Sequence, residues 1–290
     1  MRGESWSMDI VARNFFRLLS AGAFGKQDMV EPMSAYKWQK VMHLSILHGV
    51  EAETYQGLEV LDNQFAVQQV SVALRKKWAA LLSTSTERRG GENPLTARFD
   101  TLASNKRLSE HLDSLAKRCD VASPEYQLLE KMFCLAYALL TDDRWVVRMI
   151  DLGEQIRERS TAQVNQVQLK KWIGKYGLKH MALLEGALLT DLAGFMPEEL
   201  PTGFLHVSQK SPLLSSRLHA LVEKLASAVP QGQQQIRFSQ EGNEIFVHTS
   251  NANALAKNVR RSARFLPYYP VESISQLFSS FASSLTNIEE

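Results

Sequence analysis

Residues 34–49, SAYKWQKVMHLSILHG, decide the fold class of this chain. From Trp38 to Ile46 the buried-type positions recur at intervals of three and four residues, which places them on one face of an α-helix. Ser34 precedes the pattern in the position of a helix N-cap, and Gly49 follows it where a left-handed residue commonly ends a helix. The stretch therefore predicts a complete amphipathic helix with a defined start and end.

The same helical periodicity extends from about residue 8 to residue 228. It predicts a first helix that Gly22 and Gly25 end, and a helix beginning at Ser123 and Pro124 that is apolar nearly all round and should lie at the centre of the fold. Four tryptophans fall at or beside the apolar face of their helices and are predicted core residues: Trp38, Trp78, Trp145 and Trp172.

A strand-like pattern, in which apolar residues recur with a period of two, occurs only near the C-terminus, in residues 235–239 and 244–249. Turn residues lie between the two stretches, at 241–243. This pattern predicts a β-hairpin. No repeat of fixed period is present, which disfavours a regular solenoid. The sequence thus indicates a mainly α fold, a non-repetitive multi-helix bundle with one small β-hairpin near the C-terminus.

The stretch 83–93, STSTERRGGEN, interrupts the helical pattern with small polar residues and the pair Gly90 and Gly91. Such composition favours a connection between subdomains. We expect an N-terminal helical subdomain in residues 1–90 and a central helical core in residues 91–230. Residues 231–290 should form the β-hairpin, a basic helix and a C-terminal helix, packed on the core.

Composition restricts the classes of function. Lys and Arg total 33 against 31 Asp and Glu, so the net charge of +2 gives no overall attraction to nucleic acid or to membranes. The two cysteines, Cys119 and Cys134, are too few for a disulfide scaffold, which favours a reducing compartment. No apolar run has the roughly 18 residues that a membrane span needs, and no signal peptide is recognisable. We therefore expect a cytoplasmic protein without membrane-spanning segments.

Motifs that carry chemistry are missing from the sequence. Neither the dinucleotide-binding nor the P-loop glycine pattern occurs, and no pair of aspartates has the alternate spacing that two-metal sites use. Glu51 and Glu53 lie at the start of a predicted helix, where they favour the helix dipole. The seven histidines do not form a zinc-binding pattern, and His219 is among those that stand alone in the sequence. We predict no catalytic residue, no cofactor and no metal site, although a site assembled from distant residues stays open.

One chemically specific feature is a basic stripe. Lys257, Arg260, Arg261 and Arg264 fall at i, i+3, i+4 and i+7, so their side chains share one helix face. An apolar seam on the opposite side should hold this helix to the core; its predicted members are Leu255, Val259 and Leu266. Two tyrosines, Tyr268 and Tyr269, follow and could stack on bases. The stripe is compatible with a solvated face, with phosphate-backbone contact, with anionic lipid or with an acidic protein partner.

Three segments resemble known proteins: FFRLLSAGAFG with MSAYKWQKVMHLSILHGVEAETYQGL, then LKKWIGKYGLKHMALLEGALLTDLAGFMPEELP, and finally NVRRSARFLPYYPVESISQLFSSFASSLTNIEE. Together they resemble a group of uncharacterised bacterial helical proteins of similar length. The first and last also resemble the helical flanks of the uncharacterised nucleotidyltransferase family, in which a tryptophan-led helix ends near His-Gly-Val. Here those residues are Trp38 and His48, Gly49 and Val50.

That family has a Gly-Ser pair followed by a strand with two metal-binding aspartates, and this chain has neither, so no catalytic residue is carried over. The resemblance implies a helical relative without the catalytic core. We therefore expect a non-catalytic helical interaction protein that binds a protein partner or a polyanion through its basic C-terminal helix face. The alternatives are a divergent nucleotidyltransferase-like enzyme with scattered metal ligands, and a nucleic-acid-binding protein.

Overall fold

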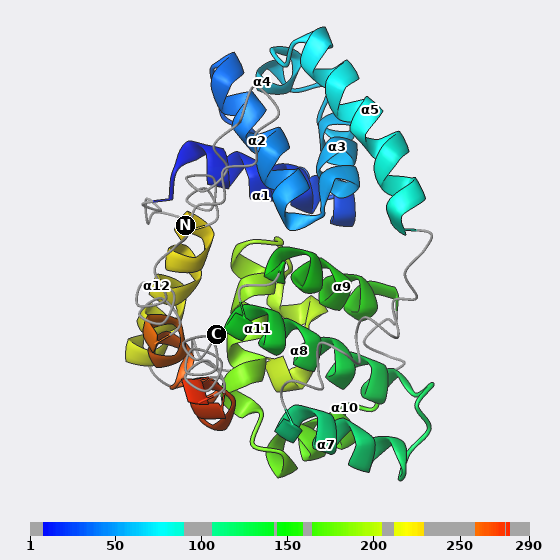
Figure 1. The fold of residues 1–290 in the computed structure, drawn as a ribbon, viewed down its shortest axis with the longest axis vertical. Helices are drawn as coiled ribbons and strands as arrows, with labels where there is room; N and C mark the ends of the chain where they lie inside the picture. Colours follow the sequence, from blue (N-terminus) through cyan, green and yellow to red (C-terminus); the bar gives the residue numbers. More distant parts are fainter. Residues whose placement is uncertain are drawn as a thin grey trace, which may run out of the picture.

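The computed structural model describes residues 8–89, 106–141, 144–158, 164–204, 212–228, 259–275 and 277–278. Over these ranges the chain is mainly α-helical and has no strand, which confirms the predicted helical fold class (Figure 1). The two halves of the predicted β-hairpin, residues 235–239 and 244–249, lie outside the described residues.

The first helices form a group at one end of the molecule, the upper end in Figure 1. They are α1 (Ile10–Phe24), α2 (Ala35–His48), α3 (Glu51–Val60), α4 (Phe65–Gln68) and α5 (Val72–Arg89). Helix α2 has the predicted caps: the Ser34 side chain accepts a hydrogen bond from the Lys37 amide, and Gly49 has φ of 66°. Trp38 of α2 is buried, as its position in the pattern predicts.

Two predicted boundaries in this group differ in part from the structure, although Gly25 ends α1 as expected. Helix α1 continues through Gly22 and ends at Phe24, where Gly25 adopts the left-handed conformation. Helix α5 continues to Arg89 through most of the stretch that we expected to be a connection. A glycine or a serine in a helix interior costs at most about 1 kcal/mol relative to alanine, so such residues weaken a helix without ending it.

A second group of helices fills the lower part of Figure 1. It contains α7 (Lys106–Ala116), α8 (Pro124–Thr141), α9 (Trp145–Glu158), α10 (Gln166–Lys175), α11 (Lys179–Asp191), the short 3-10 helices η1 (Pro197–Glu199) and η2 (Thr202–Phe204), and α12 (Pro212–Ala228). Helix α8 is central as predicted, since Met132, Phe133 and Leu135 are completely buried. Residues 259–265 and 270–275 are helical and lie beside α12 in Figure 1.

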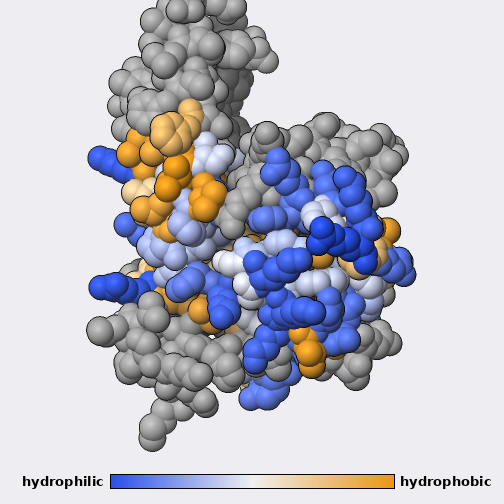
Figure 2. All heavy atoms as spheres, turned by 90° about the horizontal axis from the view of Figure 1, so that it is seen from below, coloured by the Kyte–Doolittle hydropathy of each residue, from blue (hydrophilic) through white to orange (hydrophobic). Residues whose placement is uncertain are grey.

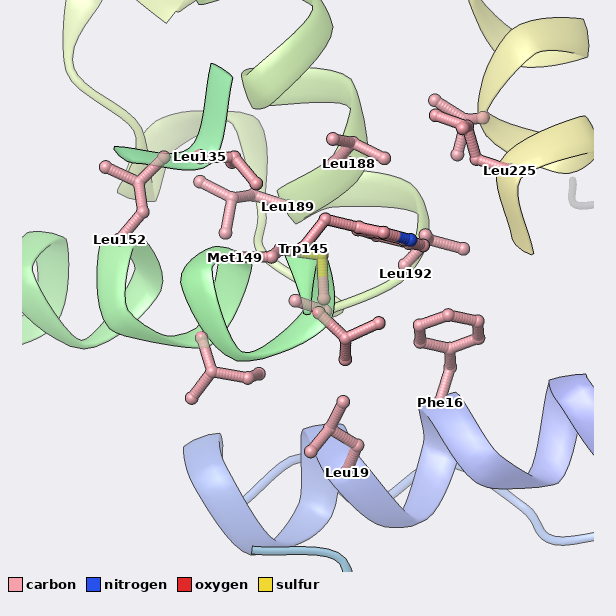
Figure 3. Packing of buried hydrophobic residues seen from close by; sticks show 14 of the residues in the cluster. Phe16, Leu19, Leu135, Trp145, Met149, Leu152, Leu188, Leu189, Leu192 and Leu225 are labelled. Carbon is pink, nitrogen blue, oxygen red and sulfur yellow. The ribbon is translucent and has the colours of Figure 1, made fainter. Parts of the chain in front are cut away.

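The two groups meet where α1 crosses α9. Phe16 and Leu19 project from α1 toward Trp145 and Met149 of α9, and all four side chains are buried (Figure 3). Burying one such side chain contributes about 1.5–3 kcal/mol. This continuous apolar layer fixes α1 on the second group.

The turn after α11 adds polar contacts to this junction. The Ser20 hydroxyl donates a hydrogen bond of 2.8 Å to the Ala193 carbonyl oxygen. Lys26 forms an ion pair with Glu199 at 3.0 Å. The Phe24 ring meets the Phe195 ring edge-to-face, with 4.9 Å between the ring centroids. The C-terminal end of α1 is thereby fixed to the segment that follows α11.

Candidate functional site

The structure separates the six residues of the predicted binding site. Arg260 is exposed, and Arg261 and Arg264 are partly buried. Lys257, the fourth cation of the predicted stripe, lies outside the described residues. Tyr268 is half-buried. Tyr269 is only 1% exposed and therefore lies in the core, where it does not present its ring to a ligand at the surface.

The predicted apolar seam of the basic helix is wrong. Val259 and Leu266, which we expected to face the core, are 37% and 43% exposed. The face that is buried carries Ser262, Phe265 and Tyr269 instead. The aromatic side chains remove more apolar area from water than valine or leucine, so burying them gives the larger gain. Leu255, the third predicted member of the seam, lies outside the described residues.

This orientation leaves apolar side chains on the surface. Val271, Ile274 and Phe278 are spaced as i, i+3 and i+7, which places them on one helix face, and they are 46%, 47% and 69% exposed. Figure 2 shows apolar side chains gathered on the side of the molecule where Figure 1 places the C-terminal helices. We use the name C-terminal surface for the exposed or partly exposed apolar and basic residues of this region: Val259, Arg260, Arg264, Leu266, Val271, Ile274 and Phe278.

The charge on this surface is positive. The sole acidic residue of the sequence between 259 and 278 is Glu272, and it is 4% exposed. Neither Arg260 nor Arg264 has an ion-pair partner in the described part of the chain. Arg217 of α12 acts electrostatically on Tyr268, so it adds a third cation close to the surface. Apolar side chains and unpaired guanidinium groups thus occur together.

A polar cluster lies beneath this surface, where the C-terminal residues pack on α11. Glu185 of α11 is 0% exposed, and neither of its carboxyl oxygens has a hydrogen-bond partner within the described residues. Tyr269 and Ser273 are 1% and 0% exposed, and their hydroxyl oxygens likewise have no partner there. Buried polar atoms normally have partners, so this group is unusual.

The protonation of this cluster follows from its burial. Burial raises the pKa of Glu185 well above its usual range. Burial also raises the pKa of Tyr269, and the nearby Glu185 and Glu272 add to that effect. Burial thus favours the neutral form of Glu185 over its carboxylate. Sequence reasoning missed it, although a glutamate within the apolar run MALLEGALL was a signal of an unusual buried carboxyl group.

A second polar contact joins α11 to α12. The Nδ1 atom of His219 lies 2.6 Å from Oδ2 of Asp191, so His219 does not stand alone as its isolation in the sequence suggested. Burial raises the pKa of Asp191, and the proximity of His219 opposes that shift. The pair joins α12 to the C-terminal end of α11.

The described ranges hold no group of side chains suited to a metal ion. There, no three His, Cys, Asp or Glu side chains converge in a way that could bind one. Glu51 and Glu53 lie in the first turn of α3, the helix-start position expected from the sequence. Among the helices that the structure describes, none is long and apolar enough to cross a membrane.

Comparison with protein-family models, with curated proteins and with solved structures finds no match. The resemblance to helical flanks of nucleotidyltransferases therefore stays a prediction from the sequence.

Proposed function

We propose that this chain is a helical interaction protein that binds an acidic partner protein through the C-terminal surface. The observation that carries the proposal is the exposed stripe of Val271, Ile274 and Phe278 beside the unpaired Arg260 and Arg264. Apolar side chains that share one helix face are costly to leave in water, and a partner helix with an apolar face would cover them. The arginines favour a partner whose flanking residues are Asp or Glu.

Nucleic acid is less well supported as the partner. Binding of single strands without sequence preference commonly combines cations with aromatic rings on which bases stack. Tyr269 is buried and Tyr268 is half-buried, so the pair of tyrosines does not form an exposed stacking platform. An apolar stripe, in contrast, has no role in contact with a phosphate backbone. These observations favour a protein partner over a polyanion.

The experiment uses two labelled synthetic helical peptides with the same leucine-rich face, one with a glutamate-rich polar face and one with a lysine-rich polar face. Fluorescence anisotropy with the full chain should detect binding of the glutamate-rich peptide and no binding of the lysine-rich peptide. Binding should be stronger at 50 mM than at 500 mM NaCl, because the electrostatic screening length is about 13 Å at the lower concentration and about 4 Å at the higher one.

Two variants test the two parts of the surface. Replacing Val271, Ile274 and Phe278 by serine should weaken binding at least about tenfold, which corresponds to about 1.4 kcal/mol. The double variant Arg260→Glu, Arg264→Glu should also weaken peptide binding at least about tenfold. It should in addition make the binding less sensitive to salt concentration. Val167→Ser is the matched control, because Val167 is 79% exposed on α10, away from this surface.

The outcomes separate the alternatives. Equal binding of both peptides, or binding that neither variant weakens, would contradict the proposal. Binding of a single-stranded oligonucleotide that the arginine variant abolishes and the serine variant leaves intact would instead identify a polyanion site.

A further inference from the structure

The C-terminal residues bury a polar and aromatic face, on which Tyr269 lies near Glu185 of α11. The buried side chains on that face include Ser262, Phe265, Tyr269 and Ser273. Tyr269 interacts electrostatically with Glu185 of α11, which shows that the two groups are close. The Ser273 amide donates a hydrogen bond of 2.8 Å to the Tyr269 carbonyl oxygen, so Ser273 lies one helical turn beyond Tyr269 on the same face. The carboxyl group therefore lies under the segment that carries the C-terminal surface.

This contact tolerates a neutral carboxyl group and does not tolerate a carboxylate. Burying a neutral acid that lacks hydrogen bonds is unfavourable, and burying an isolated charge is much more so. Within the described residues, neither carboxyl oxygen of Glu185 has a donor, and the hydroxyl groups of Tyr269 and Ser273 have no partner either. Ionisation of Glu185 therefore requires that water reach it.

The neighbouring titratable groups do not supply a compensating positive charge. On the C-terminal segment they are Tyr268, Tyr269 and Glu272, which are two phenols and a carboxyl group. On α12, His219 pairs with Asp191, and the buried acidic groups of α8 are Glu125 and Glu130. Burial is the single cause of the raised pKa of Glu185. No cation in the described part of the chain lowers that pKa. A charge on Glu185 is therefore relieved by moving the C-terminal segment away.

We infer that Glu185 is a pH-sensitive latch that holds residues 259–275 on α11 while it is protonated and releases them when it loses its proton. The regulatory consequence rests on the proposed function, because release would move the C-terminal surface away from the α11 face that supports it. The latch itself does not depend on any partner. Rising pH should open it, since the proton is bound in the closed form.

The test measures the position of the segment by energy transfer between two dyes on the full chain. Cys119→Ser and Cys134→Ala remove the native thiols, and Leu266→Cys and Val167→Cys provide exposed labelling sites on the segment and on α10. As the pH rises from 6, the transfer efficiency of this background should change as a one-proton titration. Adding Glu185→Gln should keep the efficiency at its pH 6 value throughout, because the amide is neutral at every pH.

Two further variants make the result decisive. Glu185→Met removes the titrating group with a side chain of similar volume, and it should also abolish the pH response. Glu198→Gln changes an exposed glutamate and should leave the response unchanged. An unchanged efficiency in the background protein, or the same pH response after Glu185→Gln and Glu185→Met, would overturn the latch.

The peptide experiment then separates the two proposals. If the latch and the binding surface are both correct, binding of the glutamate-rich peptide should weaken as pH rises and should become independent of pH after Glu185→Gln. A pH-dependent transfer efficiency without any peptide binding would support the latch and contradict the proposed function.

Discussion

At the scale of single residues, a few polar side chains fix segments that have no regular structure. Asn14 of α1 accepts a hydrogen bond from the Glu31 amide at 3.0 Å and donates one to the Glu31 carbonyl oxygen at 2.8 Å. The Glu31 carboxylate in turn binds Arg13 at 2.8 Å and Arg17 at 2.7 Å. Gln64 holds the same connection from the other side, through Asp28 and Val30. The segment between α1 and α2 is therefore held in place by side-chain contacts.

Glu31 should make part of the stability sensitive to acid. The hydrogen bond from Arg13, assisted by Arg17 and opposed by burial, lowers the pKa of Glu31 from 4.5 to about 2. A lowered folded-state pKa gives stability that is present above the unfolded value and is lost as the pH falls through the folded value. Because the carboxylate is 34% exposed, solvent screening reduces this contribution to about 1 kcal/mol.

The measurement is urea unfolding of the native protein and of Glu31→Gln between pH 2 and pH 7. The variant should be less stable at pH 7, and the difference should shrink as the pH falls from about 4.5 to about 2. A difference of the same size at every pH would show that Glu31 acts through shape or packing and not through its charge.

At the scale of secondary-structure elements, two glycines allow α1 and α3 to cross in close contact. A Cβ atom at Gly22 would lie 1.7 Å from the Glu53 carbonyl oxygen, and one at Gly57 would lie 1.9 Å from the Leu18 carbonyl oxygen. Both distances are far below van der Waals contact, and the obstructing atoms belong to the backbone. Each helix therefore supplies a glycine where the backbone of the other passes.

We expect Gly22→Ala and Gly57→Ala each to destabilise the protein by about 3 kcal/mol or more, the upper range for overpacking, because whole helices would have to separate. Gly174→Ala is the matched control: it lies in α10, and a Cβ atom there would meet only the end of the Lys179 side chain, at 4.0 Å. The control should be stabilising by up to about 1 kcal/mol. Thermal unfolding followed by circular dichroism gives all three values, and mild effects at both crossing positions would contradict the close approach.

At the scale of the whole molecule, Phe24 connects the two groups of helices. Its ring packs against Phe195 after α11, its carbonyl oxygen accepts a hydrogen bond from Arg157 of α9, and a Cβ atom at Gly153 would lie 2.6 Å from its ring. Phe24 is 2% exposed. The junction thus combines buried aromatic side chains with the Lys26–Glu199 ion pair.

Phe24→Ala should cost about 3–5 kcal/mol and should uncouple the two groups of helices. Scanning calorimetry of the native protein should give one main transition, and the variant should give two. Phe65→Ala is the control, because Phe65 is 71% exposed, and it should change stability by less than about 0.5 kcal/mol. A single transition in the Phe24 variant would show that other contacts suffice to couple the groups.

The sequence alone determined the local features of this protein. Helix positions follow from the spacing of apolar residues and from caps such as Ser34 and Gly49, because those interactions join residues a few positions apart. The burial of Trp38, Trp78, Trp145 and Trp172, at 8% exposed or less, follows from the same periodicity. The tertiary structure alone decided which face of residues 259–269 is buried and brought Tyr269 close to Glu185. Both outcomes depend on competition for burial between residues far apart in the chain, which a local pattern does not contain.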